Sequence, residues 1–225
     1  MEKKDSLTVL ITGANRGIGL ALCKQYIKQD YHVIGVCRNV SDELAALDIE
    51  VIDSIDVSKA EDIKRLNDAL NERHIDILIN NAGILRSQTF NSLDYQEMLE
   101  QFQVNTLGPI RVVDALRNNI SSGSKVIMIT SRMGSIEDNT SGGQYGYRMS
   151  KCALNAASKS LALDLQPKGI ALALLHPGYV QTDMVNHGGD ITADVSAERL
   201  VQRVEELNLE NSGSFWHSNG EFLPW

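Results

Sequence analysis

The chain has few cysteines and prolines, no low-complexity stretch and no surplus of basic residues, and each deficit excludes a class of protein. Its three cysteines, Cys23, Cys37 and Cys152, are scattered and odd in number, so they match neither a metal-binding spacing nor a disulfide framework. The four prolines form no linker-like segment. We therefore expect residues 1–225 to fold as a single domain.

The formal net charge of −8 argues against a nucleic-acid partner and against an anionic membrane surface, since both attract basic proteins. The apolar run at residues 7–12 is far too short for a signal-peptide core or a membrane-spanning helix. With 43% hydrophobic residues, the chain can bury a substantial core. These features predict a soluble, cytoplasmic protein.

Short β-branched runs alternate with longer stretches of helical character. Strands are predicted at 7–12, 32–36, 50–55, 75–79, 125–130, 171–175 and 214–217. Helices are predicted at 17–29, 61–71, 95–118, 147–165 and 197–206, the last one capped by Ser196. This alternation indicates an α/β protein with a Rossmann fold: a doubly wound parallel sheet of about seven strands, with helices on both faces.

The first predicted strand runs directly into a glycine-rich turn, with Gly13, Gly17 and Gly19 spaced around Asn15 and Arg16, and a helix follows. Glycines there let the backbone turn sharply, let a pyrophosphate approach, and let helix and strand pack closely. The helix then offers free N–H groups and the positive end of its dipole to phosphates. The turn therefore predicts a dinucleotide site, although its spacing differs from the commoner fingerprint.

The end of the second predicted strand bears on the choice of cofactor. NAD enzymes usually place a carboxylate there to bind the ribose 2′-hydroxyl, whereas this strand ends at Arg38. Arg16 is close enough in the glycine turn to converge with Arg38, and two guanidinium groups suit a 2′-phosphate. We predict NADP(H), with NAD(H) possible. The competing interpretation is that Arg38 is a solvated loop residue.

A tyrosine and a lysine four positions apart, Tyr147 and Lys151, share one face of a predicted helix. A nearby ammonium stabilises a phenolate and is expected to lower the tyrosine pKa, which suits a general acid or base. Tyr145 lies six residues from Lys151 and points to a different side of the helix. We therefore favour Tyr147.

With these motifs the chain resembles the short-chain dehydrogenase/reductase superfamily, in its compact single-domain branch. The resemblance covers essentially the whole chain in order. It includes the glycine turn, Asp56-Val57, Asn80-Asn81-Ala82-Gly83, Asn105 in a long helix, Ser131, Tyr147-x-x-x-Lys151, and the run from Pro177 to Thr182. A short loop at 184–196, which corresponds to the substrate-covering loop, and the ending Phe222-Leu223-Pro224-Trp225 are most similar to the C-factor-like carbonyl reductases.

The resemblance implies a catalytic set of Asn105, Ser131, Tyr147 and Lys151. Ser131 would bind the substrate oxygen, and Tyr147 would donate a proton as hydride arrives from the nicotinamide. Lys151 would hold the ribose hydroxyls and depress the Tyr147 pKa, and Asn105 would order a water that connects Lys151 to solvent. Because the segment after Ser131 is longer than usual, Ser135 is a second candidate for the serine.

The predicted cofactor contacts extend from the glycine turn to the loop after the sixth strand. Asp56 and Val57 would hold the adenine, and Thr182 the carboxamide. The full set is Gly13, Asn15, Arg16, Gly17, Ile18, Gly19, Arg38, Asp56, Val57, Asn81, Ala82, Gly83, Tyr147, Lys151, Pro177, Gly178, Val180 and Thr182.

The function we expect is transfer of hydride between NADP(H) and a small-molecule carbonyl or alcohol, as in a carbonyl reductase. The alternative is an NAD(P)-binding signalling or regulatory protein with little turnover, and the intact catalytic set favours the enzyme. The chain is too short for the extra substrate domain of a related epimerase or dehydratase. The resemblance also implies a homodimer or homotetramer formed through helices 95–118 and 147–165.

Overall fold

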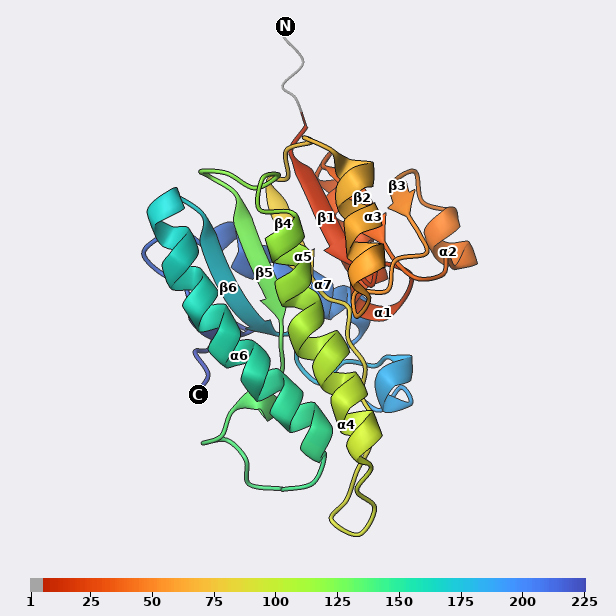
Figure 1. Ribbon diagram of the computed structural model, residues 1–225, viewed down its shortest axis with the longest axis vertical. Coiled ribbons are helices and arrows are strands. Elements are labelled where there is room, and N and C mark those ends of the chain that lie inside the picture. Colours follow the sequence, from red (N-terminus) through yellow and green to blue (C-terminus); the bar gives the residue numbers. More distant parts are fainter. Residues whose placement is uncertain (1–5) are drawn as a thin grey trace, which may run out of the picture.

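The structure, a computed structural model, describes residues 6–225 and is built on a seven-stranded parallel sheet (Figure 1). The strand order is β3-β2-β1-β4-β5-β6-β7. The strands are β1 (Thr8–Thr12), β2 (His32–Val36), β3 (Glu50–Ile52), β4 (Ile77–Asn80), β5 (Lys125–Ile129), β6 (Ala171–His176) and β7 (Ser214–His217). The doubly wound parallel sheet that the sequence predicts is therefore confirmed.

Helices cover both faces of the sheet. The α-helices are α1 (Gly17–Lys28), α2 (Asp42–Ala45), α3 (Ala60–Leu70), α4 (Tyr95–Phe102), α5 (Gly108–Ala115), α6 (Tyr145–Leu165) and α7 (Ala193–Glu206). A π-helical turn, Gln103–Leu107, joins α4 to α5, and short 3-10 turns lie at Arg132–Gly134, Gln166–Lys168 and Asp183–Val185. In Figure 1, α4, α5 and α6 lie in front of the sheet and α7 lies behind it.

Two apolar clusters, one on each face, hold the layers together. One unites α1 and α7 with the sheet through side chains such as Leu22 and Leu200, and the other unites α3, α5 and α6 with it. All six residues of β6 are buried, as expected for a strand covered on both faces. None of the helices found in residues 6–225 has the length and apolar composition needed to cross a membrane.

The topology determines where a ligand can bind. All strands run in parallel, so their carboxyl ends meet at one edge of the sheet, the lower edge in Figure 1. Strand β1 pairs with β2 on one side and with β4 on the other, so the chain order reverses beside it. Doubly wound sheets bind their ligands in the crevice at such a point.

Several predicted boundaries were wrong. The helix predicted at 95–118 is interrupted by the π turn and ends at Ala115, and α2 was not predicted. Helix α7 begins four residues earlier than predicted, because the side chain of Thr192, and not that of Ser196, caps it by accepting the Val195 N–H. Ser196 lies inside the helix and donates to the Pro177 carbonyl.

Candidate active site

The glycine turn after β1 adopts a backbone that side chains would prevent. Gly13 and Gly17 have φ angles of +68° and +53°. A Cβ on Gly13 would lie 2.9 Å from the Cα of Ala82, and one on Gly17 would lie 3.3 Å from Cγ2 of Thr182. The turn therefore fits closely between the segments that follow β4 and β6.

Polar contacts fix this turn to the end of β4. The Thr12 hydroxyl accepts the N–H groups of Asn81 and Ala82, at 3.0 and 3.1 Å. The Asn81 amide donates in return to the carbonyls of Thr12 and Gly13, at 2.9 and 3.2 Å. The predicted role of Asn81 beside the cofactor thus includes holding the glycine turn in place.

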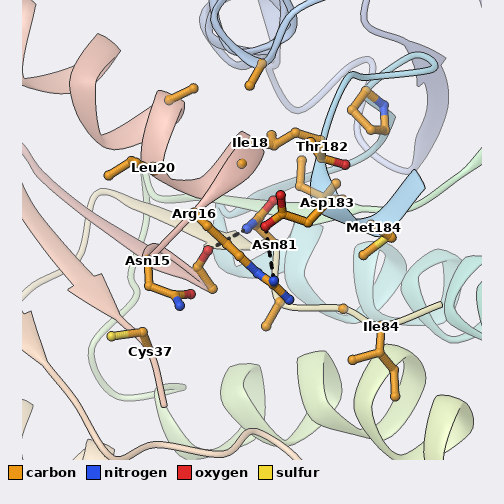
Figure 2. A pocket seen from close by; sticks show the side chains of 18 of the residues that line it. Asn15, Arg16, Ile18, Leu20, Cys37, Asn81, Ile84, Thr182, Asp183 and Met184 are labelled. Carbon is orange, nitrogen blue, oxygen red and sulfur yellow. Dashed lines mark hydrogen bonds and ion pairs between the residues drawn. The ribbon is translucent and has the colours of Figure 1, made fainter. Parts of the chain in front are cut away.

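A cavity of about 680 Å³ is lined by the glycine turn and by Tyr147 and Lys151. Figure 2 shows part of its lining, around Arg16, Asn81 and Asp183. Its volume falls in the range of small-molecule sites. The predicted cofactor residues that line it are Gly13, Asn15, Arg16, Gly17, Ile18, Arg38, Asp56, Val57, Asn81, Ala82, Gly83, Tyr147, Lys151, Pro177 and Thr182. Gly19, Gly178 and Val180 do not line it. A Cβ on Gly19 would collide with the Gly13 carbonyl, and Val180 is buried and bridged to Ile191.

The two predicted phosphate-binding arginines each face a different carboxylate. Arg16 lies 3.2 Å from Asp183, and Arg38 lies 4.0 Å from Asp56. Asp56 is also held by the N–H and hydroxyl of Ser58, which lower its pKa against the effect of burial. Each guanidinium is thus paired with a separate carboxylate, and the convergence of Arg16 and Arg38 on one phosphate stays a prediction. Sequence reasoning missed Asp183, since 167 positions separate it from Arg16.

Tyr147 and Lys151 are both buried at the inner end of the cavity. Burial raises the pKa of Tyr147 to about 12, while the neighbouring Ser131 side chain acts to lower it. Burial also lowers the pKa of Lys151 to about 8. The ammonium lies 5.9 Å from the centre of the Tyr147 ring and donates to the Ile129 carbonyl at 2.9 Å. The expected lowering of the Tyr147 pKa is therefore wrong for this arrangement, since desolvation dominates.

The structure distinguishes the two candidate serines. Ser131 follows β5, caps the 3-10 turn Arg132–Gly134, and interacts with Tyr147. The Ser135 hydroxyl instead donates to the Trp225 carbonyl at 3.1 Å and accepts the Asp138 N–H. Ser131 is thus the serine beside the tyrosine, and Ser135 ties the long segment after it to the last residue of the sequence.

Asn105 lies in the π turn and is completely buried. Its amide accepts the Ile84 N–H at 2.8 Å and donates to the Ile84 carbonyl at 2.8 Å and to the Ser150 hydroxyl at 3.0 Å. A Cβ on Gly83 would lie 3.3 Å from the Asn105 amide oxygen and 3.8 Å from the Lys151 Nζ, so the two side chains approach the same point. The π turn therefore directs the amide toward the lysine.

Ser150 is a site residue that sequence reasoning missed. It has no exposed surface, and its hydroxyl donates to the Tyr147 carbonyl at 2.8 Å while accepting from Asn105. Thr106 donates to the Ser150 carbonyl at 2.7 Å. The only signal in the sequence is a small hydroxyl residue beside Lys151, on the face of α6 that turns out to be buried.

The residues of the site fit the phosphate groups of a dinucleotide. Arg16 is the N-cap of α1 and provides no side-chain cap, so a phosphate can accept from the first-turn N–H groups at the positive end of that helix dipole. The close packing around Gly13 and Gly17 brings the backbone itself to the cavity wall. Two cationic side chains, Arg16 and Arg38, line the same cavity.

Comparison with known proteins shows similarity to a family of dehydrogenases. The model of the short chain dehydrogenase family matches residues 7–191. The 1-hydroxy-2-glutathionyl-2-methyl-3-butene dehydrogenase of Rhodococcus sp. (strain AD45) is 38% identical over 224 residues, 97% of this chain and 99% of its own length. The C-signal protein of Myxococcus xanthus is 43% identical over 154 residues, 67% of this chain and 93% of its own.

Solved structures of carbonyl reductases are similar over the whole sheet. The carbonyl reductase Sniffer of D. melanogaster has a TM-score of 0.90 and 33% identity, covering 98% of this chain and 100% of its own. An NADPH-bound carbonyl reductase from chicken fatty liver has a TM-score of 0.88 and 28% identity, covering 98% and 99%. With these matches and the family model spanning most of its length, the chain belongs to the short-chain dehydrogenase family and is an NAD(P)-dependent oxidoreductase of that family.

Proposed function

We propose that this protein is an NADP(H)-dependent carbonyl reductase in which Tyr147 is the proton donor. The observation that carries the proposal is a buried phenol and a buried ammonium at the inner end of a cavity that begins at a glycine turn. Such a cavity can hold a dinucleotide with its reactive end beside the phenol.

The cofactor supplies the hydride, and the chain supplies its binding groups. The α1 N-terminus and the glycine turn bind the pyrophosphate, Arg38 and Arg16 bind the 2′-phosphate, and Thr182 is the candidate to bind the nicotinamide carboxamide. Two observations support NADP(H): no carboxylate ends β2, and the similar reductase from chicken fatty liver is described as NADPH-bound.

The raised pKa of Tyr147 is consistent with the role of a proton donor. With a pKa raised to about 12, the phenol stays protonated at neutral pH and can donate to a carbonyl oxygen as negative charge develops there. Ser131 orients that oxygen, and Lys151 stabilises the phenolate that remains.

The second candidate is an NAD(P)-binding signalling protein with little turnover. The specific observation in its favour is the 43% identity to the C-signal protein. The complete set of Asn105, Ser131, Tyr147 and Lys151, of which Tyr147 and Lys151 line the cavity, favours the enzyme. A protein that needs only to bind a nucleotide has no use for the buried phenol.

The test is a panel of ketones, aldehydes and quinones assayed with NADPH and with NADH, using the native chain and Tyr147→Phe. The native chain is expected to reduce at least one carbonyl class with a higher kcat/KM for NADPH. Tyr147→Phe should bind NADPH with unchanged affinity and lose at least about 100-fold in kcat, the contribution of a general acid.

Tyr145→Phe is the matched control, because Tyr145 is in the same helical turn and does not line the cavity. It should retain turnover. If Tyr147→Phe reduces carbonyls at the native rate, Tyr147 is not the proton donor. If the native chain binds NADPH and reduces no carbonyl in the panel, the signalling candidate is favoured.

A further inference from the structure

A single ion pair connects the glycine turn with the loop that covers the cavity. Arg16 Nη1 lies 3.2 Å from Asp183 Oδ2, although 167 positions separate the two residues. Figure 2 shows the Arg16 side chain extended toward Asp183 across the cavity. Both side chains are more than half exposed, so the pair lies at the mouth of the cavity and not in the core.

Asp183 is held in its position from the other side. Its Oδ1 lies 3.2 Å from Nε2 of His187, so each carboxylate oxygen has a different partner. Backbone hydrogen bonds close the loop around it, from Gln181 N to Ile191 O, from Asp190 N to Tyr179 O and from His187 N to Thr182 O. A Cβ on Gly189 would lie 2.5 Å from the Gln181 nitrogen. The carboxylate is therefore carried by a closely packed loop.

The pair holds Arg16 on a different carboxylate from the one that Arg38 faces. In Figure 2 a dashed line marks the contact between the Arg16 guanidinium and the Asp183 carboxylate. A carboxylate at this distance also offsets the positive charge that would attract a phosphate. To act together with Arg38 on one phosphate, Arg16 has to leave Asp183.

We propose that Asp183 competes with the 2′-phosphate of NADP(H) for Arg16 and is thus a third determinant of cofactor preference. The inference rests on the NADP(H) function proposed above. The phosphate breaks the ion pair between Arg16 and Asp183. The glycine turn and the loop after β6 thereby lose this contact. NAD(H) has no 2′-phosphate and leaves the pair intact. The competition weakens binding of the phosphorylated cofactor only modestly, because an exposed ion pair is weak.

The test uses two fragments that differ only in the phosphate, ADP-ribose and 2′-phospho-ADP-ribose, with affinities measured by calorimetry. Neither fragment carries a nicotinamide, so the result does not depend on turnover. Asp183→Asn should strengthen binding of the phosphorylated fragment roughly two- to fivefold and leave ADP-ribose binding unchanged. In an Arg16→Gln background, Asp183→Asn should no longer change the ratio of the two dissociation constants.

Asp194→Asn is the matched control, because Asp194 also lines the cavity and the substitution removes the same charge. Asp194→Asn should leave the ratio of the two dissociation constants unchanged. The inference is overturned if Asp183→Asn leaves the ratio unchanged, if it strengthens both fragments equally, or if Asp194→Asn has the same effect. Failure of the native chain to bind either fragment would instead contradict the proposed cofactor.

Discussion

At the scale of single residues, Ser150 shows how a side chain outside the cavity can organise the site. Its hydroxyl connects the Asn105 amide to the Tyr147 carbonyl, and every atom of this link is buried. Ser150→Ala removes two buried hydrogen bonds, one from the Asn105 amide and one from the Tyr147 carbonyl, at a cost of about 1–3 kcal/mol. Because the link ends on Tyr147, we expect kcat to fall by about tenfold while the dissociation constant of NADPH stays unchanged.

Chemical denaturation and steady-state kinetics check this prediction. Ser160→Ala, at an exposed position of the same helix, is the control and should change neither quantity. Native stability and native kcat in Ser150→Ala would show that the serine contributes nothing to the placement of Tyr147.

At the scale of elements, the close approach of a 3-10 turn to α6 sets the distance between Ser131 and Tyr147. A Cβ on Gly134 would lie 2.8 Å from the Lys151 carbonyl carbon and 2.9 Å from its oxygen, both backbone atoms that cannot easily move. Gly134→Ala should therefore push the turn off the helix, with a loss of about 1–3 kcal/mol in unfolding free energy. Because Ser131 begins the turn, we expect kcat to decrease as well.

The control is Ile136→Ala, which alters an exposed side chain of the same segment. The unfolding free energy and the kcat of Ile136→Ala should both be close to the native values. Equal effects of the two substitutions on kcat would mean that the approach of turn and helix is unimportant for the site.

The same elements show what the sequence could predict. The bounds of β2 and β7 were predicted correctly, because a β-branched or aromatic run ended by turn residues is a local signal. The π turn was not predicted, since its cause is tertiary: Asn105 bonds the backbone of Ile84, which follows a different strand. The Arg16–Asp183 ion pair likewise could not be predicted from local sequence, since 167 positions separate the two residues. The positions of Tyr147 and Lys151 followed from helical spacing, whereas the burial that shifts their pKa values did not.

At the scale of the whole molecule, the stability of the chain should depend on pH through a buried histidine. His176 ends β6 beside His217, and burial first, then His217 and Arg132, lower its pKa to about 3. Between that value and about 6.5 the unfolded chain binds a proton at this position and the folded chain does not. Stability is therefore lost as the pH falls through this window, by up to about 1.4 kcal/mol per pH unit.

Denaturation of His176→Asn at several pH values between 4 and 7.5 tests this dependence. The substitution should make the decline toward acid shallower than in the native chain, whatever it costs at neutral pH. Ser160→Ala, at an exposed site and without an ionisable side chain, should keep the native slope. Parallel curves for the native chain and His176→Asn would rule out the histidine as the source.

The π turn carries a consequence for how this scaffold can be altered. It contains one residue more than a regular helix needs at that place, so removing a residue from 103–107 would yield a straighter, more regular rod. The local widening of the helix around Asn105 would then disappear. Selection for thermal stability alone would favour this deletion. The deletion would also remove the geometry that directs the Asn105 amide toward Lys151.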